Sequence, residues 1–480
     1  MNLAEYSACD GLGLAALIRR KEVTAEEVLA IALAAVAKVN PEINAVLQTL
    51  PKAARAALKR GVPAGPFTGV PTLVKELVIH AAGVRSDMGS RLAQGFTPRR
   101  DTELMARLRR AGLLLIGTTQ TPELGYNPTT ECVLFGPVRN PWDPTRSAGG
   151  SSGGAGAAVA AGMVPLAQGS DGGGSIRIPA ACNGLVGLKP TRDRIPSGPD
   201  YGDLLCGWAT EFAVTKSVRD AAALLDAVAG PDVGAPHLIA PPPRPFSKEL
   251  TARSPKLRIA WTTKPASGAK IDPECKRAVE RTVQTLIDLG HTLIESGPRY
   301  DWEPFLQATH IVWATFTAQF VDALVAAMGR SADRSTLEAA TLACYQDGKR
   351  RSASELLNAL AHGNTLTRMV GNFFEDVDVL VTPTTAKPAP PLGEINQNWH
   401  GVTAEGWTEQ VFNYVPFTAL FNTTGNPAVS LPLHWTAHGL PVGVQLVAGL
   451  GDESTLLRVA AQLEQALPWK KRTPLIHAGR

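Results

Sequence analysis

The pattern of apolar and polar positions along the chain predicts alternating helices and strands. Thr24 and Glu27 have the spacing of a capping box, and the Ala-, Leu- and Val-rich stretch that follows to about Asn40 predicts a helix. A second helix is predicted over 101–111, and it leads into a short buried strand at 113–116. Alternation of this kind is typical of layered α/β proteins.

The same alternation continues through the second half of the chain. A capping spacing at Ser217 begins a helix that should end before Gly230, and the Pro-rich stretch 235–255 is expected to be a surface loop. Four further segments follow the pattern: a strand at 257–261, a helix at 272–289, a mostly helical region at 302–375 and a final helix at about 454–467. Short apolar runs bounded by Pro and Gly predict more central strands at 378–382, 428–431 and 443–447.

Composition and charge narrow the classes of function. The 480 residues carry a formal charge of +4, and the basic residues are scattered, so neither nucleic acid nor an acidic membrane surface is indicated as a partner. Six cysteines without a C-x-x-C pair argue against disulfide scaffolds and zinc ribbons, and the nine histidines form no metal-binding motif. We therefore expect no metal ion. No export signal or membrane-spanning segment is visible, so we also expect a cytoplasmic protein.

Glycine and serine are concentrated between residues 145 and 198, where two serine motifs compete. Residues 149–153 satisfy G-x-S-x-G, the nucleophile elbow of Ser–His–Asp esterases of the α/β-hydrolase type. That motif requires a strand before its serine, whereas 140–146 contains two prolines and is expected to be a loop. The motif also requires a later acid and a later histidine; His400 and His434 are present, but nothing in the sequence singles one out.

The second motif, residues 169–177, has the composition of an acyl-transfer site. Successive glycines allow several backbone N–H groups to point toward a developing oxyanion, and Ser175 follows directly after them. A serine hydroxyl needs a base, and a lysine kept neutral by desolvation can serve as one. The candidate is Lys75, which follows the apolar run 72–74.

At this point a family resemblance becomes visible. Residues 149–192 closely resemble the amidase signature, and matching segments occur at 69–77, 140–146, 380–385, 421–432 and 439–449. The resemblance implies an α/β amidase-signature fold, with a central mixed twisted sheet covered by helices on both faces. It also implies one domain, 1–480, with a core at about 65–235 and 375–480 and a helical, substrate-shaping region at about 255–375. The C-terminal segment around 460–474 resembles the branch of cyclic-amide (nylon oligomer) and carbamate hydrolases.

The resemblance also implies roles for individual residues. The nucleophile would be Ser175, the bridging serine in a cis peptide would be Ser151, and the base would be Lys75. No metal or organic cofactor is required for this chemistry. The resemblance also implies that the backbone donors to the oxyanion are Gly172, Gly173, Gly174 and Ser175. From the residues themselves we expect Ser152 and Ser170 to donate supporting hydrogen bonds, and the charges of Asp171 and Arg177 to brace the loop without reacting.

The implied activity is hydrolysis of an acyl C–N bond through an acyl-enzyme. The segments 201–208 and 302–320 are expected to line the pocket, and their few charges favour small neutral, apolar or aryl amides (anilides, linear or cyclic amides) or carbamates as substrates. A subunit of a glutaminyl-tRNA-forming amidotransferase and a Ser–His–Asp esterase remain as alternatives, and a homo-oligomer stays open. The family's usual glycine is replaced by Asp193, which leaves the role of Arg194 open.

Overall fold

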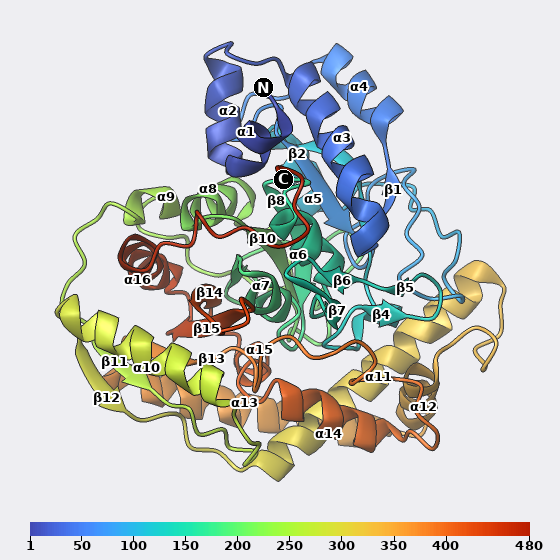
Figure 1. The fold of residues 1–480 in the computed structure, drawn as a ribbon. Coiled ribbons are helices and arrows are strands. Elements are labelled where there is room, and N and C mark those ends of the chain that lie inside the picture. Colours follow the sequence, from blue (N-terminus) through green and yellow to red (C-terminus); the bar gives the residue numbers. More distant parts are fainter.

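The computed structural model describes all 480 residues, and one mixed sheet of eleven strands lies at its centre (Figure 1). The order across the sheet is β1-β3-β2-β8-β10-β9-β14-β15-β13-β11-β12. Its strands are β1 (Val46–Thr49), β2 (Pro71–Lys75), β3 (Leu114–Thr119), β8 (Leu166–Asp171), β9 (Val186–Lys189), β10 (Thr210–Thr215), β11 (Arg258–Trp261), β12 (Thr292–Glu295), β13 (Val379–Pro383), β14 (Ala428–Trp435) and β15 (Pro441–Ala448).

Helices and loops cover the sheet. Every residue of β2, β8, β10, β13 and β15 is buried, so both faces of these strands are covered. The helices are α1 (Leu3–Ala8), α2 (Gly11–Arg19), α3 (Ala25–Ile43), α4 (Pro51–Arg60), α5 (Glu103–Arg110), α6 (Gly153–Ala160), α7 (Arg177–Asn183), α8 (Val218–Val228), α9 (Phe246–Glu249), α10 (Pro273–Asp288), α11 (Trp302–Met328), α12 (Ala339–Gly348), α13 (Ala353–Asp376), α14 (Ala404–Tyr414), α15 (Leu420–Thr423) and α16 (Glu453–Ala466). The α/β fold class expected from the sequence is confirmed.

Local sequence signals explain where several helices begin. Thr24 caps α3, and the Glu27 side chain bonds back to the Thr24 backbone, so the predicted capping box is present. Ser217 caps α8 through the amide of Asp220. The carboxylate of Asp220 does not return to this cap, because it accepts hydrogen bonds from the first amides of α2. The predicted cap therefore also ties two distant helices together.

Helices gather at opposite ends of the molecule. Figure 1 shows α1 to α4 at one end and α11, α13 and α14 across the other. Of all the helices, α11 alone has the length and apolar composition that a membrane span requires. It packs against α12, α13 and α14, and part of its surface is buried in these contacts.

The topology brings one end of β2 next to one end of β8. The two strands run parallel, with Leu73 opposite Ala167, so their carboxyl ends lie at the same edge. Lys75 ends β2 and Asp171 ends β8. On its other edge, β8 pairs with the antiparallel strand β10, so β8 lies between β2 and β10.

The segment before Ser151 differs from the loop that its prolines predict. It contains β6 (Arg139–Asn140) and β7 (Asp143–Ser147), which pair with each other outside the main sheet, and β4 (Glu131–Cys132) forms a similar pair with β5 (Gly136–Pro137). Arg146 of β7 also forms a single bridge with Pro391. Because β7 lies outside the main sheet, it is not the central strand that feeds the serine of an α/β-hydrolase.

Candidate active site

Lys75 is completely buried, and its amine contacts three serine hydroxyls. The Nζ atom lies 2.7 Å from Ser151 Oγ, 2.9 Å from Ser170 Oγ and 3.1 Å from Ser152 Oγ. The backbone N–H of Lys75 donates to Gln168 Oε1 at 3.0 Å, which fixes the end of β2 against β8. Four of the residues singled out from the sequence therefore meet at one point.

The surroundings of Lys75 favour its neutral form. Burial lowers the pKa of Lys75 from 10.5 to about 7, against the opposing negative charges of Asp171 and Glu211. An amine with this pKa is substantially unprotonated near neutral pH. It can then accept a proton from a hydroxyl instead of donating three of its own.

The hydroxyl protons around Lys75 are not equivalent. Ser152 Oγ donates to the carbonyl of Ser170 at 3.2 Å, so toward Lys75 it acts as an acceptor. The hydroxyls of Ser151 and Ser170 contact no other acceptor, and either can donate to a neutral amine. The Gly150–Ser151 peptide is cis, as the resemblance implied.

Ser175 lies at the entrance of this arrangement. It follows the glycines 172–174, is 8% exposed and lines the same pocket as Ser151. No hydrogen bond joins the hydroxyls of Ser175 and Ser151, so a proton can pass from Ser175 to Lys75 only when these two hydroxyls approach each other. Catalytic hydrogen bonds are commonly long before substrate binds.

The glycine-rich turn provides three amides without a partner in the protein. The N–H groups of Gly172, Gly173 and Ser175 make no internal hydrogen bond. Gly174 differs from the expectation, because its N–H donates to Asp171 Oδ1 at 2.8 Å and is not free for a substrate oxygen. The available donors are therefore three of the four amides that the sequence indicated.

Asp171 and Arg177 form a fully buried ion pair behind the turn. Arg177 Nη2 lies 2.8 Å from Asp171 Oδ1, and Arg177 Nε lies 3.0 Å from Asp171 Oδ2. Burial raises the pKa of Asp171, but the charge and hydrogen bonds of Arg177 hold it well below its usual range. The amides of Gly174 and Ile176 also donate to Asp171, so the pair braces the turn, as the sequence led us to expect.

The pocket above Ser175 is apolar and contains no charged side chain. Its empty space, part of which is open to solvent, measures about 500 Å³, and ten of its fifteen lining residues are hydrophobic. The wall includes Tyr201, Leu204 and Leu205 from the first expected segment and Trp313, Phe316 and Phe320 from the second. Leu77, Val78 and Leu124 also line it, although the sequence analysis did not identify them.

Two buried polar residues beside Lys75 were also missed. Gln168 Nε2 donates to Glu211 Oε1 at 2.8 Å, and Gln168 Oε1 accepts from the Lys75 backbone. Both side chains are at most 3% exposed. A charged residue inside the apolar β-branched run 210–215 was the sequence signal that could have pointed to Glu211.

The Ser–His–Asp alternative receives no support from the geometry. No histidine contacts Ser151 or Ser175; His434 contacts Glu274 at 2.8 Å, and His400 is exposed. The amine of Lys75 occupies the position beside Ser151 that a base requires.

The departure from the family pattern at Asp193 has a structural explanation. Asp193 adopts φ 63°, a left-handed conformation that glycine normally takes and that aspartate tolerates. The next residue, Arg194, forms a buried ion pair with Glu453 at 3.0 Å and donates to the carbonyl of Ala240. These contacts hold the segment that follows β9 against the start of α16. Arg194 does not line the pocket.

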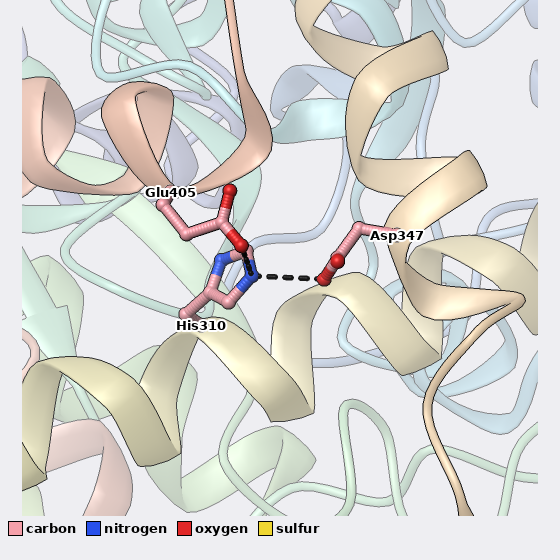
Figure 2. Close-up of side chains that lie close together, drawn as sticks. All are labelled: His310, Asp347 and Glu405. Atoms are coloured by element: carbon pink, nitrogen blue, oxygen red, sulfur yellow. Dashed lines mark hydrogen bonds and ion pairs between the residues drawn. The ribbon is translucent and has the colours of Figure 1, made fainter.

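A second polar cluster lies among α11, α12 and α14 (Figure 2). His310 Nε2 is 2.9 Å from Asp347 and 3.7 Å from Glu405, a grouping that resembles a metal site. The Arg351 guanidinium lies 3.0 Å from Asp347 and 3.3 Å from Glu405, and therefore already provides a positive charge there. This cluster is an ion-pair network that joins the three helices.

Comparison with known proteins identifies the family of the chain. The family model described as Amidase matches residues 27–457. The chain belongs to the amidase signature family. It is 36% identical, over 97% of its length and 96% of the relative's, to a 6-aminohexanoate-cyclic-dimer hydrolase from Paenarthrobacter ureafaciens. This membership makes the chain a hydrolase that acts on C–N bonds.

Solved structures of other amidase-signature proteins have the same fold. A structure of 6-aminohexanoate cyclic dimer hydrolase superposes with a TM-score of 0.92, 35% identity and coverage of 98% of this chain and 99% of that chain. A bacterial aryl acylamidase superposes with a TM-score of 0.86, 26% identity and coverage of 97% of both chains. The fold expected from the signature motif is thus found in both structures.

Proposed function

We propose that this amidase hydrolyses small uncharged amides through an acyl-enzyme on Ser175, with Ser151 and Lys75 as the proton relay. The observation that carries the proposal is the contact of a fully buried Lys75 Nζ with Ser151 Oγ at 2.7 Å, beside a pocket that also contains Ser175. A desolvated amine is the one available base, because neither serine contacts a histidine.

The reaction starts when substrate places its carbonyl carbon next to Ser175. Neutral Lys75 takes the proton of Ser151 while Ser151 takes the proton of Ser175, and Ser175 Oγ attacks the carbonyl carbon. The negative oxygen that develops is stabilised by the N–H groups of Gly172, Gly173 and Ser175, which have no other partner.

The second half of the reaction returns the proton. Lys75 delivers it through Ser151 to the leaving nitrogen, the C–N bond breaks and the amine departs. Water then attacks the ester on Ser175 and gives a proton to Lys75 by the same relay. When the C–O bond to Ser175 breaks, Lys75 returns that proton through Ser151 to Ser175 Oγ, and the carboxylic acid is released. Every proton moves among groups of this chain and the substrate, and the chemistry calls for no metal or organic cofactor.

The pocket indicates the class of substrate. With hydrophobic walls and no charged side chain, it disfavours charged acyl groups, because they would lose hydration without gaining a partner. Anilides, linear amides and cyclic amides fit this chemistry, and the resemblance to cyclic-amide and aryl-amide hydrolases supports the same range. We include aryl carbamates as a second class, since their carbonyl can be attacked in the same way.

The test is a turnover screen of the isolated chain with p-nitroanilides, linear and cyclic amides, and aryl carbamates. We expect amine release by the wild type without partner chains, and losses of about 10⁴-fold or more for Ser175→Ala and Lys75→Met. Ser151→Ala should lose far more activity than the matched Ser152→Ala, because the Ser152 proton is already held by a carbonyl.

Circular dichroism and urea unfolding establish that each variant folds like the wild type. Near-normal turnover by folded Lys75→Met or Ser175→Ala would refute the proposal. Amide turnover that requires added partner subunits would instead favour the amidotransferase alternative.

A further inference from the structure

Glu211 occupies an unusual position for a carboxylic acid. It lies in β10 directly opposite Ser170 of β8, in a strand whose six residues are all buried. Side chains of directly paired residues point to the same face of a sheet, so Glu211 lies beside a hydroxyl that contacts Lys75. The proposed mechanism gives it no role.

The contacts of Glu211 are incomplete. Its Oε1 accepts a hydrogen bond from Gln168 Nε2 at 2.8 Å, while its buried Oε2 has no partner. A buried carboxylate oxygen without a donor is destabilising, and natural proteins rarely keep one without a reason. The same Gln168 accepts from the backbone N–H of Lys75, so one amide side chain links Glu211 to the strand that carries the lysine.

The carboxyl groups of Asp171 and Glu211 both act on the charge of Lys75, but only one of them has a positively charged partner of its own. Asp171 is neutralised by two hydrogen bonds from Arg177 and accepts further bonds from Asn422 and from backbone amides. The Glu211 side chain has one hydrogen-bond partner, the uncharged Gln168. Its charge is therefore the one that can respond when Lys75 gains or loses a proton.

We propose that Glu211 is a positioning residue for the active-site lysine: its carboxyl group, held by Gln168, determines how readily Lys75 releases and regains its proton. The inference rests on the proposed function, in which Lys75 is the base. An ionised Glu211 stabilises the ammonium that forms while Ser175 attacks, and a neutral Glu211 lets the free amine persist.

The protonation behaviour of the two groups agrees with this coupling. Burial raises the pKa of Glu211 and the positive charge of Lys75 lowers it, so the carboxylate is favoured while Lys75 is an ammonium. Burial lowers the pKa of Lys75 to about 7, and Asp171 and Glu211 oppose the decrease. Tyr201 also faces Glu211, and burial raises the pKa of its phenol, so it stays uncharged through the working range.

The test is the pH dependence of kcat/KM and of kcat for Glu211→Gln. The new amide can keep the hydrogen bond from Gln168 but carries no charge. We expect the acid limb of the kcat/KM profile to move to lower pH by about one unit, because an anion that favours the Lys75 ammonium has been removed. The plateau should fall by less than about tenfold, because a base of lower pKa is a weaker base.

Two variants serve as controls. Glu211→Asp keeps the negative charge and should leave the acid limb near its wild-type position. Glu123→Gln replaces another buried acid, whose pKa burial raises to about 7. Glu123 does not act on the charge of Lys75, so the acid limb of the kcat/KM profile should not move in this variant.

The possible outcomes separate the two proposals. An acid limb in Glu211→Gln that coincides with the wild type, whether or not the plateau falls, would overturn the role of Glu211. If Lys75→Met is inactive at the same time, the proposed function stands without this addition. If Lys75→Met remains active, the base itself has been misassigned and the proposed function fails first.

Discussion

At the residue scale, the ionisation of Lys75 sets the pH range of activity. Burial lowers the pKa of Lys75 from 10.5 to about 7, so the amine is mostly neutral above that pH and mostly protonated below it. We therefore expect kcat/KM to be flat above about pH 8 and to fall about tenfold per unit well below pH 7. Stopped assays with an uncharged amide across pH 5–9 measure this, and a profile that stays level down to pH 5 would contradict it.

Single residues also show what the sequence could and could not predict. Lys75, Ser151 and Ser175 were identified because the matching segments are long and specific. In the structure, Lys75 Nζ contacts Ser151 Oγ, and Ser175 lines the same pocket as Ser151. The loss of Gly174 as a donor depends on where the Asp171 carboxylate turns. That direction is set by packing around the turn, which residue types alone do not specify.

At the element scale, α11 forms one wall of the pocket. Trp313, Phe316 and Phe320 occur at spacings of three and four residues and so share one face of the helix. Tyr126 stacks on Trp313 with ring centroids 4.4 Å apart, which holds the indole in place. The helix thus determines how large an apolar group can enter.

This wall predicts a change in substrate preference. Phe316→Ala should raise KM for anilides about tenfold or more, because the aryl group loses apolar contact, while kcat changes little. KM for a small aliphatic amide should change by less than about threefold. The exposed Gln319→Ala on the same helix is the control, and equal effects of the two variants on both substrates would contradict this role of α11.

Element boundaries were largely predictable where caps and periodicity are strong. The helices predicted over 101–111 and 272–289 appear as α5 and α10, and the strand predicted over 443–447 appears as β15. The two-stranded pairs β4–β5 and β6–β7 were not expected. They are short and rich in proline, so they carry no alternation of apolar and polar positions from which a strand could be predicted.

At the scale of the whole molecule, one buried arginine joins parts of the fold that are far apart in sequence. Arg177 contacts Asp171 in β8, Asn422 in α15 and Gln445 in β15, and the last contact spans 268 residues. Local patterns do not reveal which distant elements meet. The sequence therefore predicted the Asp171–Arg177 pair and not the contacts of Arg177 with α15 and β15.

This network predicts an unequal cost for removing charges. Asp171→Asn leaves Arg177 buried without its counter-ion and should reduce the free energy of unfolding by about 3–5 kcal/mol. Glu295→Gln removes the partner of Lys264 in an exposed pair and should cost less than about 1 kcal/mol. Urea unfolding at pH 7 measures both, and a similar cost for the two variants would show that Asp171 does not brace the fold.

The central claim, that Ser175 becomes acylated, is tested most directly by trapping the intermediate. Intact-mass spectrometry after rapid acid quench of a reaction with a slowly deacylated O-aryl carbamate, which loses its phenol when the serine attacks, should show one added carbamoyl group per chain. Peptide mapping should place this group on Ser175. Ser175→Ala should gain no mass under the same conditions. An adduct on a different residue, or an equal adduct on Ser175→Ala, would contradict the account.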